Sequence, residues 1–344
     1  MLRYLLPFLV SFSITVVLIF IGMFLGKKIK WCGRNSERHI HDGRSLRIGG
    51  LAMIIAFNLA IFLNKDLVIT TELLGFMLAT GAILLVGAWD DLFELFWKTQ
   101  LFYQVAVAIL VFIFGVRIYY ISNFFTGGII NFNSGLGVLF SVGLVLLWII
   151  LMINSMNWID GIDGISGGVT FIGAIAMFLL SLKPEVNQPP MAIMAMILAG
   201  TSIGFLIFNF NPSLVLAGTS GSMFMGFSLA VIAIFSGTKI ATAILVMAIP
   251  VIDFIWVIGE RIKNKKSIFK PDKNHLHHKL LELGWSQRRI ALYFYAITVG
   301  IAVIALNTKA LGKTLAIIGI ALIMVGALAV VNKKISQKKR TLVG

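Results

Sequence analysis

Long apolar segments recur along the whole chain, and they constrain its fold more than any other feature. A segment of about twenty apolar residues is long enough to cross the hydrocarbon core of a bilayer as an α-helix. The sequence therefore predicts an all-α, polytopic integral membrane protein with about eleven transmembrane helices. The first segment is too long for a signal peptide, so it is expected to be a retained span. The apolar segments lie near residues 5–26, 48–63, 67–89, 101–121, 136–155, 165–182, 191–208, 223–237, 239–260, 290–307 and 312–331.

The composition agrees with a membrane protein of one domain. Of the 344 residues, 59% are hydrophobic and 12% are charged, whereas soluble domains carry about 25% charged residues. No hydrophilic block is long enough to fold separately, so residues 1–344 are predicted to form a single domain. The one cysteine, Cys32, has no partner for an internal disulfide and suggests no cysteine metal cluster.

The basic residues predict an orientation in the membrane. Alternate gaps between the apolar segments hold 22 of the 29 Lys and Arg residues, in the loops 27–47 and 261–289, at Lys98 and in the tail 332–344. By the positive-inside rule, the N-terminus is predicted to lie outside and the C-terminus in the cytoplasm. The net charge of +15 indicates orientation and contact with anionic lipid. Nucleic-acid binding is not expected, because the basic residues lie beside membrane spans without a fold of their own.

A polar stretch, Asn154–Gly164, interrupts this apolar background with the sequence N-S-M-N-W-I-D-G-I-D-G. Two carboxylates and two amides at a membrane boundary are costly unless something binds there. Asn154 and Asn157 are three residues apart, so they share one face of a continuing helix. Gly161 and Gly164 would let the backbone approach a bulky ligand. The alternative is a capping turn between two membrane helices, in which these residue types are common.

Two adjacent carboxylates, Asp90 and Asp91, follow the third apolar segment. They repel each other unless a cation compensates, and magnesium phosphate sites commonly combine one or two carboxylates with substrate phosphates. Lys98 and Gln104 follow at a spacing suited to gripping an anion beside the pair. The alternatives are solvated residues at a helix end and a lysine that reaches the membrane interface.

Three of the five histidines, His275, His277 and His278, fall within four residues of a basic stretch. Zinc is one interpretation, but no cysteine or carboxylate arrangement completes a tetrahedral site. A cradle for a diphosphate fits better, and a solvated basic loop is the alternative. Asp253 lies inside the ninth apolar segment and needs a partner, which Arg261 or the site itself could supply. A structural ion pair is at least as reasonable there as a catalytic role.

Three further segments give weaker signals. Arg47–Gly50 opens the second apolar segment, where glycines permit close helix packing. Gly218–Ser222 opens the eighth, and its amides and hydroxyls are suited to phosphate at a helix N-terminus. Tyr119–Gly135 mixes β-branched, aromatic and Asn/Gly residues on the predicted outer side, which favours a small hairpin. The polar motifs, by contrast, fall on the predicted cytoplasmic side, which favours an active site there.

Together these motifs resemble the polyprenyl-phosphate N-acetylhexosamine-1-phosphate transferase family over nearly the whole chain. The form H-L-H-H followed by L-L-E-L-G is similar to the branch that uses UDP-N-acetylglucosamine, rather than the branch that transfers phospho-N-acetylmuramoyl-pentapeptide. The motifs are R-I-G-G-L-A at Arg47–Ala52, D-D at Asp90-Asp91, N-x-x-N-x-x-D-G-x-D-G at Asn154–Gly164, F-N-F-N-P-S at Phe208–Ser213 and D-K-N-H-L-H-H-K-L-L at Asp272–Leu281.

The resemblance implies a multi-pass enzyme of the bacterial inner (plasma) membrane whose active site faces the cytoplasm. The implied reaction transfers N-acetylglucosamine-1-phosphate from UDP-GlcNAc to undecaprenyl phosphate, giving undecaprenyl-diphosphate-GlcNAc and UMP. This is the first membrane step of a cell-envelope polysaccharide, such as lipopolysaccharide or teichoic acid. Mg²⁺ is the implied cofactor, with Mn²⁺ as a substitute. The implied partners are the two substrates and the lipid bilayer, and a homodimer stays open.

The resemblance also implies roles for individual residues. Asp90 and Asp91 would organise the acceptor phosphate, one of them as a base, and Lys98 would hold it. Asp160 and His277 would join the catalytic group, and Asn157, Asp91 and the residue at position 219 would hold the metal. The remaining implied substrate-binding residues are Asn154, Asp163, Arg261, His275, His278 and Lys279.

Of the positions that depart from the family pattern, two bear most directly on the site. Where the family has G-D-x-G-S, with the Asp as a principal magnesium ligand, this chain has G-T-S-G-S with Thr219. A threonine hydroxyl is neutral, so metal affinity should fall sharply. We therefore expect an altered, poorly active form of a normal transferase. Gln100 stands where a second Lys is often found, which leaves Lys98 as the acceptor-phosphate ligand.

Three other functions stay open. A transporter or channel would place its polar groups near mid-membrane in two matching halves, unlike the one-sided motifs here. A non-catalytic binder of lipid or UDP-sugar is more credible because of Thr219. The same reaction with another UDP-N-acetyl-hexosamine is open as well, because selectivity for one sugar substituent rests on few contacts.

Overall fold

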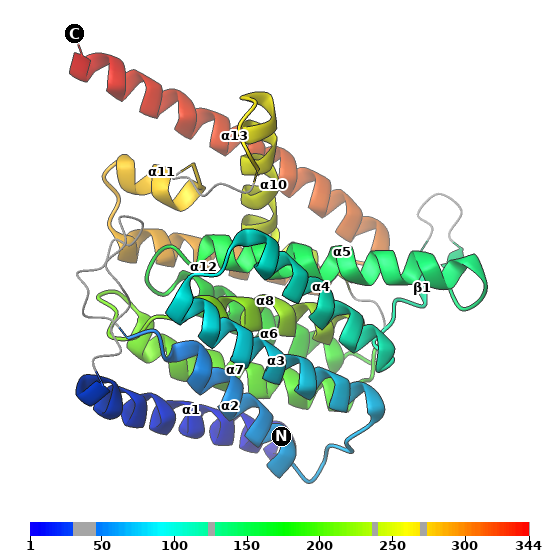
Figure 1. Cartoon of the computed structure of the whole chain (residues 1–344). Helices are drawn as coiled ribbons and strands as arrows, with labels where there is room; N and C mark the ends of the chain where they lie inside the picture. The colour runs from blue at the N-terminus through cyan, green and yellow to red at the C-terminus, as the bar shows by residue number, and fades with distance from the viewer. Residues whose placement is uncertain (30–45, 123–127, 236–239, 269–273, 344) are drawn as a thin grey trace.

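The computed structural model describes residues 1–29, 46–122, 128–235, 240–268 and 274–343 (Figure 1). Most of these residues lie in apolar α-helices, and two short strands form a hairpin. The helices are α1 (Leu2–Ile29), α2 (Gly49–Leu63), α3 (Thr71–Phe93), α4 (Trp97–Ile113), α5 (Leu136–Ile159), α6 (Ile165–Ser181), α7 (Pro189–Asn209), α8 (Gly218–Phe235), α9 (Ile240–Val246), α10 (Ala248–Lys263), α11 (Leu276–Glu282), α12 (Gln287–Asn307) and α13 (Ala310–Val343), and the strands are β1 (Tyr120–Ser122) and β2 (Ile129–Asn131).

Seven of the described helices, α1, α3, α5, α7, α8, α12 and α13, are long and apolar enough to cross a membrane. The bent pair α9–α10 makes an eighth candidate, and α2, α4 and α6 are apolar but only 10–17 residues long. The prediction of a helical, multi-pass membrane protein is confirmed. The number of eleven spans, the orientation and the single domain stay predictions.

The ninth predicted span, 239–260, is not one straight helix. Its two parts, α9 and α10, meet at an angle of 78° just after Val246. Pro250 explains the break, because it has no N–H to donate to the carbonyl of Val246 and its ring crowds that oxygen. In the first turn of α10 the missing N–H has no cost. As a result α10 runs across the direction of the other helices (Figure 1).

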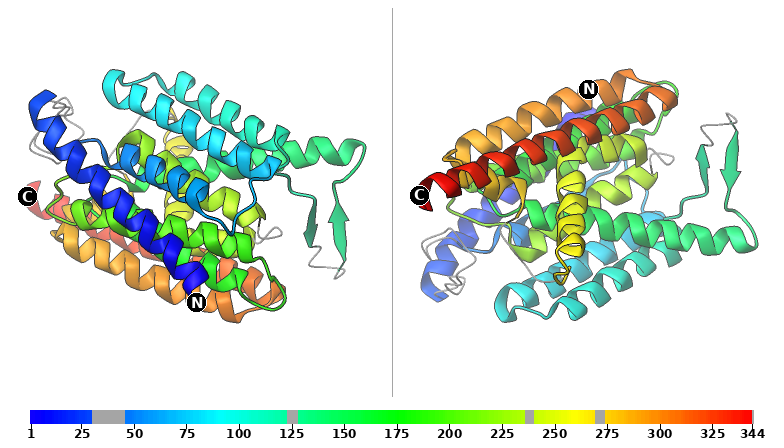
Figure 2. Two further views of the ribbon diagram at one scale, coloured as in Figure 1. Left: turned by 90° about the horizontal axis from the view of Figure 1, so that it is seen from below. Right: turned by 90° about the horizontal axis from the view of Figure 1, so that it is seen from above.

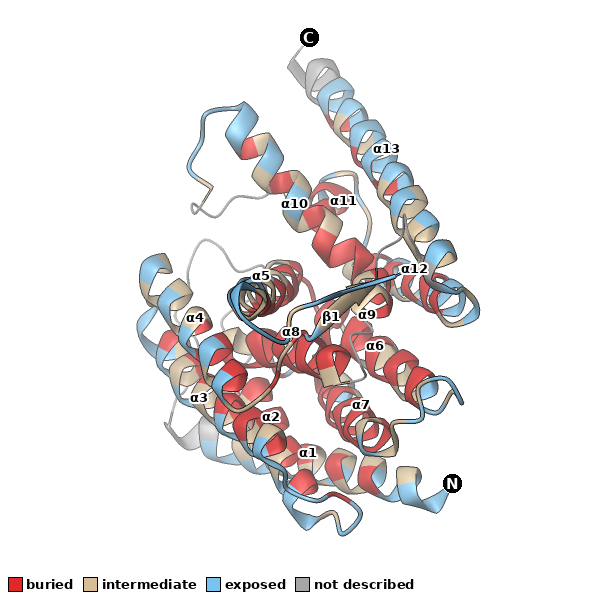
Figure 3. Ribbon diagram, turned by 90° about the vertical axis from the view of Figure 1, so that its right-hand side faces the viewer, coloured by how far each residue is buried: buried red, intermediate tan, exposed pale blue. Residues whose placement is uncertain are grey.

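Helix α8 forms the centre of the bundle. Figure 3 shows it ringed by α2, α3, α5, α6 and α7, and 83% of its spanning window is buried, against 11% for α13. Phe57 of α2 packs edge-on against Phe76 of α3 and Phe224 of α8, with ring centroids 5.4 and 5.3 Å apart. The outer helices expose leucines and phenylalanines instead, as expected for surfaces in contact with lipid.

The first turn of α8 lies directly against the backbones of α2 and α3. A Cβ atom on Gly50 would lie 2.2 Å from the nitrogen of Gly221, and a Cβ on Gly87 would lie 2.3 Å from the Cα of Ser220. Both distances are far below van der Waals contact, so only glycine fits at these crossings. The prediction that the glycines after Arg47 permit close helix packing is confirmed.

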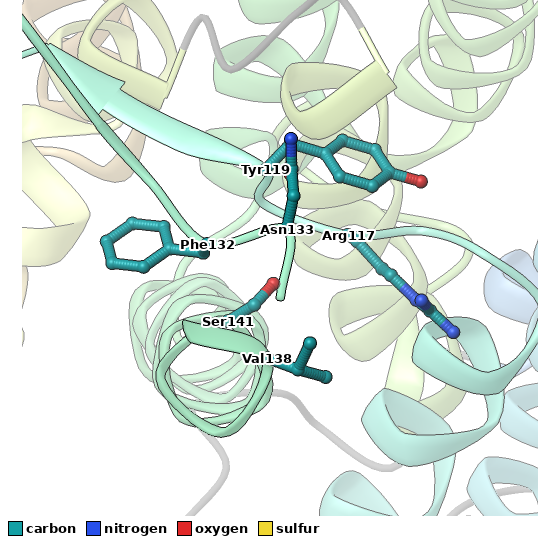
Figure 4. Close-up of a pocket in the computed structure, with 6 residues that line it drawn as sticks. All are labelled: Arg117, Tyr119, Phe132, Asn133, Val138 and Ser141. Atoms are coloured by element: carbon teal, nitrogen blue, oxygen red, sulfur yellow. The ribbon is translucent and has the colours of Figure 1, made fainter. Parts of the chain in front are cut away.

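The predicted hairpin is also confirmed. Strand β1 pairs antiparallel with β2, with Tyr120 opposite Asn131 and Ser122 opposite Ile129. The hairpin projects from the end of the bundle opposite the C-terminus (Figure 2). Beside it lies a cavity of about 150 Å³, which Arg117 and Tyr119 line together with residues at the start of α5 (Figure 4).

Candidate active site

The polar motifs meet at the end of the bundle where the chain's C-terminus lies, at the left of Figure 1. The turn after α5, the first turn of α8, the residues before α2 and the start of α11 all reach this end. A cavity of about 220 Å³ opens among them. Its polar lining comes from segments far apart in the sequence: Arg47, Asn157, Asp160, Asp163, Asn209, Thr219 and His278.

The two asparagines of the central motif face different neighbours. Helix α5 continues to Ile159, so both lie within it as predicted. Asn157 lines the cavity, and its Oδ1 accepts a hydrogen bond of 2.9 Å from the Ser222 hydroxyl of α8. Asn154 instead pairs with Gln104 of α4, donating from Nδ2 to Oε1 at 2.6 Å. Gln104 therefore joins two helices rather than gripping an anion beside Asp90.

Asp160 follows the last residue of α5 and lines the cavity. One of its carboxylate oxygens accepts a hydrogen bond from the Ser166 hydroxyl. Burial raises the pKa of Asp160 to about 7, and the Ser166 hydrogen bond works in the opposite direction. A nearby cation would restore the charged form of such a carboxylate.

Asp163 also lines the cavity, and it binds the segment that follows α7. Its Oδ2 accepts hydrogen bonds from Asn211 Nδ2 at 2.9 Å and from the Ser213 N–H at 3.0 Å. The next residue, Gly164, has φ +83° and donates its N–H to Asn209 Oδ1 at 2.9 Å. The F-N-F-N-P-S motif therefore fixes the turn between α5 and α6, and glycine is needed at its positive φ.

Tyr295 of α12 completes this turn, and its removal gives a testable effect. Its hydroxyl donates to the Gly164 carbonyl at 2.5 Å. We expect Tyr295→Phe to lower kcat/KM by about 5-fold, because one buried hydrogen bond contributes about 1 kcal/mol. Tyr293→Phe on the same helix is the control, since Tyr293 is 42% exposed. Steady-state kinetics that gave both variants the same activity would contradict a role for Tyr295 in holding the turn.

The two adjacent carboxylates hold different parts of the fold. Asp90 is buried, and its Oδ1 accepts 2.8 Å hydrogen bonds from the Leu95 N–H and from Gln100 Nε2. Asp91 accepts from the Thr219 N–H at 2.8 Å and from the Ser220 N–H and hydroxyl at 3.4 and 3.2 Å. Asp90 thus orders the turn between α3 and α4, and Asp91 caps the N-terminus of α8. Their catalytic and metal-binding roles stay predictions.

The sequence suggested that the amides of Gly218–Ser222 bind phosphate, but in the structure the first of them bind a carboxylate of the same chain. The carboxylate of Asp91 takes the place that an anion would occupy, because it accepts from the first N–H groups of α8. Its side chain is 3% exposed, and a guanidinium nitrogen of Arg47 lies 3.7 Å from its Oδ1. The dipole of α8 therefore stabilises a carboxylate of the same chain.

Three predicted substrate-binding cations are not among the described residues that line the cavity, although the Arg261 guanidinium lies 4.7 Å from the ring centroid of Trp158, which does line it. Lys98 is exposed at the start of α4, with Nζ 5.7 Å from the ring centroid of Trp97. Arg261 is buried and donates to the Ile268 carbonyl at 2.6 Å. Lys279 forms an ion pair of 3.3 Å with Glu260. Their roles toward substrate stay predictions.

The sequence left two partners open for Asp253, Arg261 and the site itself, and the structure pairs it with a histidine of the site. Asp253 Oδ2 lies 2.8 Å from His275 Nδ1, and Oδ1 accepts a 2.8 Å hydrogen bond from the Leu276 N–H. Arg261 is eight residues further along α10, which places it about 12 Å away along the helix axis. Asp253 therefore anchors the N-terminus of α11 and orients His275. The structure favours a structural role for Asp253 over a catalytic one, because Asp253 does not line the cavity.

His277 is buried between the other two histidines. Its ring stacks on His275 at 5.6 Å and lies 4.2 Å from His278, which lines the cavity. Burial, and then the two neighbouring histidines, keep the pKa of His277 well below its usual value, so the ring is neutral. Neither ring nitrogen has a hydrogen-bond partner among the described residues. A Cβ on Gly161 would lie 2.6 Å from Nε2, which shows how closely the glycine turn approaches this ring.

The donors around the cavity fit a hard cation held with help from a substrate. Within the described part of the chain, no three His, Cys, Asp or Glu side chains form a group that could hold a metal ion. The cavity does offer oxygen donors of the kind that Mg²⁺ takes: the Asn157 amide, the Asp160 carboxylate and the Thr219 hydroxyl. Because Mg²⁺ is often bound by one or two carboxylates plus substrate phosphates, this set fits a weakly held ion.

Several residues of the site were not predicted from the sequence. Ser166, Gln287 and Tyr295 each bond to the turn after α5, yet nothing in the sequence distinguishes them from ordinary polar residues of a helix. Asn209 and Asn211 lie within the F-N-F-N-P-S motif. The motif indicated that these residues matter, but no role was predicted for either of them.

Comparisons with known proteins agree with the motifs. The family model described as glycosyl transferase family 4 matches residues 73–237. The decaprenyl-phosphate N-acetylglucosaminephosphotransferase of Mycolicibacterium smegmatis is 32% identical over 327 residues, which cover 84% of this chain and 78% of that protein. A Bacillus subtilis protein, named probable undecaprenyl-phosphate N-acetylglucosaminyl 1-phosphate transferase, is 28% identical over 98% of this chain and 94% of its own length. The undecaprenyl-phosphate α-N-acetylglucosaminyl 1-phosphate transferase of Escherichia coli K12 is 26% identical over 86% of this chain and 80% of its own.

Proposed function

Because this chain belongs to the family of polyprenyl-phosphate N-acetylglucosamine-1-phosphate transferases, we propose that its substrates are UDP-GlcNAc and undecaprenyl phosphate. It is a phosphotransferase of the membrane. The proposed products are undecaprenyl-diphosphate-GlcNAc and UMP. The reaction would begin a cell-envelope polysaccharide, such as a lipopolysaccharide or a teichoic acid, at the bacterial inner membrane.

The observation that carries this proposal is the cavity where motifs far apart in the sequence meet. Asn157, Thr219 and His278 all line it, from three separate segments. A lipid phosphate and a soluble nucleotide can react only at a membrane surface. The distribution of 22 Lys and Arg residues in one set of gaps supports a cytoplasmic position for this end of the bundle.

In the proposed mechanism, the chain mainly positions its substrates and neutralises their charge, as phosphoryl transfer requires. Asp163 would keep the cavity wall rigid through its bonds to Asn211 and Ser213. The neutral His277 would form hydrogen bonds with the diphosphate or the sugar. His278 would contact them from the cavity wall. Asp90 and Asp91 would organise the acceptor phosphate through the side chains they hold, Gln100 and Arg47, and this phosphate is already anionic and needs no strong base.

A metal ion would add charge neutralisation at the diphosphate. Asn157, Asp160 and Thr219 would hold Mg²⁺, or Mn²⁺ in its place, with Asp91 behind Thr219. Because Thr219 offers a neutral hydroxyl where the resembled family has a carboxylate, we propose that this chain binds the ion weakly and turns over slowly.

A panel of radiolabelled UDP-sugars with undecaprenyl phosphate tests the proposed function. The purified chain should form a lipid-linked product from UDP-GlcNAc, with UMP released in equal amount. A product from another UDP-N-acetyl-hexosamine alone would change the proposed sugar. UDP binding without any product, even at high Mg²⁺, would favour the non-catalytic binder that Thr219 makes credible.

A further inference from the structure

The charges around the cavity raise the question of what binds an anionic substrate there. Asp160 and Asp163 contribute carboxyl groups to its lining, and each opposes the approach of a phosphate group when it is ionised. Among the described lining residues, Arg47 is the one Lys or Arg side chain. A permanent positive charge that attracts phosphate groups into the cavity must therefore come from Arg47 or from parts of the chain outside the described lining.

The backbone of Arg47 is held firmly beside the first turn of α8. The flanking residue Leu46 forms a parallel bridge with Val215, in which the Leu216 N–H donates to the Leu46 carbonyl at 2.9 Å. The Gly49 N–H donates to the Leu216 carbonyl at 3.0 Å. Arg47 therefore projects from a fixed point next to Gly218 and Thr219, where it needs little further ordering to bind a ligand.

The contact between Arg47 and Asp91 is of a kind that a ligand can replace. The nitrogen and oxygen are 3.7 Å apart, which is longer than a charge-assisted hydrogen bond of about 2.8 Å. Asp91 also accepts from two N–H groups and one hydroxyl of α8, so it stays satisfied when the guanidinium moves. The Arg47 side chain is 14% exposed, against 3% for Asp91, so the cation faces the cavity more than its partner does.

We propose that Arg47 is a phosphate-binding residue that exchanges Asp91 for phosphoryl oxygens when substrate enters. A guanidinium suits this task, because its planar donors can bind two oxygens of one phosphate group. The identity of the ligands rests on the proposed function. Two of them carry the required chemistry, the diphosphate of the UDP-sugar and the phosphate of the polyprenyl acceptor.

Binding of UDP and of undecaprenyl phosphate, each measured by calorimetry in detergent with EDTA, tests this role without turnover. Arg47→Gln should weaken at least one ligand by about 10-fold or more, because a hydrogen bond to a charged group is worth about 1.5–3 kcal/mol. Arg47→Lys keeps the charge and should lose less. A loss confined to UDP assigns Arg47 to the nucleotide, and a loss confined to undecaprenyl phosphate assigns it to the acceptor. Arg117→Gln, near the cavity at the opposite end, is the control and should change neither.

Asp91→Asn gives an effect of opposite sign, which a purely structural ion pair would not produce. The asparagine oxygen can still accept from the Thr219 N–H, while the charge that competes with phosphate for Arg47 is gone. We expect Asp91→Asn to tighten binding of the same ligand about 3-fold. If Arg47→Gln does not fold, the comparison of Arg47→Lys with Asp91→Asn decides the question.

The outcomes separate the two proposals. Folded Arg47→Gln protein with unchanged affinity for both ligands, and no tightening in Asp91→Asn, would overturn the role of Arg47 while leaving the transferase proposal intact. Wild-type protein that binds UDP through Arg47 but forms no lipid-linked product would overturn the transferase proposal alone. Wild-type protein that binds neither ligand would overturn both.

Discussion

Replacing Thr219 by aspartate should raise Mg²⁺-dependent UMP release by about 100-fold, because metal-ion stabilisation of phosphoryl charge is worth several kcal/mol. Thr219 lies at the first turn of α8 and lines the cavity beside Asn157 and Asp160. A carboxylate at this position would give the ion a charged ligand in place of a neutral hydroxyl. The measurement is UMP release as a function of Mg²⁺ concentration, in which the half-saturating concentration should fall as the maximal rate rises.

Thr219→Asn provides the matched control for this substitution. Asparagine has the shape of aspartate without its charge, so it should gain little. Its backbone N–H can still donate to Asp91, which keeps the N-terminus of α8 capped. If Thr219→Asp shows no gain over the natural chain, the position is not the place of a missing metal ligand, and the proposal of a weakened transferase fails.

Gly87→Ala should abolish most of the activity, with a loss of about 100-fold, because displacing a catalytic group by about 1 Å can cost that much. A Cβ on Gly87 would lie 2.3 Å from the Cα of Ser220 and 2.7 Å from its nitrogen. Backbone atoms cannot rotate away, so α3 must separate from the first turn of α8. That movement would disturb both the cap that Asp91 provides and the position of Thr219. UMP release and thermal unfolding should be measured on the same preparation.

Gly81→Ala on the same helix is the control for the glycine crossing. A Cβ on Gly81 meets nothing within 4 Å, and alanine in a helix interior is favoured over glycine by about 0.5–1 kcal/mol. This variant should keep its activity, and its unfolding temperature should stay the same or rise slightly. Equal activity of the Gly81 and Gly87 variants would show that the contact between α3 and α8 does not position the site.

The membrane architecture was predictable because a bilayer imposes the length and apolar character of each span. Asn157, Asp160, Asp163, Thr219 and His278 were also predicted as site residues, and the structure brings all five to one cavity. Their roles rest on the resemblance, since motif spacing indicates that residues gather but not what each one contacts. The hairpin after Tyr119 was predictable for a local reason, because strand-forming residues there surround a turn.

The partners of buried charges were not predictable, because they depend on how helices from distant segments pack. Asp253 found His275 rather than Arg261, which lies on the same helix but about 12 Å further along it. Asp91 caps α8, so the N–H groups that the sequence suggested for phosphate donate to this carboxylate instead. The break before α10 follows from Pro250, a signal present in the sequence, but hydrophobic length alone predicted one continuous span.

Cysteine accessibility in oriented membrane vesicles tests most directly whether distant segments form one UDP-binding cavity that faces the cytoplasm. In a Cys32→Ser background, Thr219→Cys and His278→Cys should react with an impermeant maleimide only in inside-out vesicles, and UDP should protect both. Tyr119→Cys, beside the hairpin, should react only in right-side-out vesicles. Labelling of the Thr219 and His278 positions from opposite sides of the membrane, or labelling that UDP leaves unchanged at both, would contradict the shared cavity.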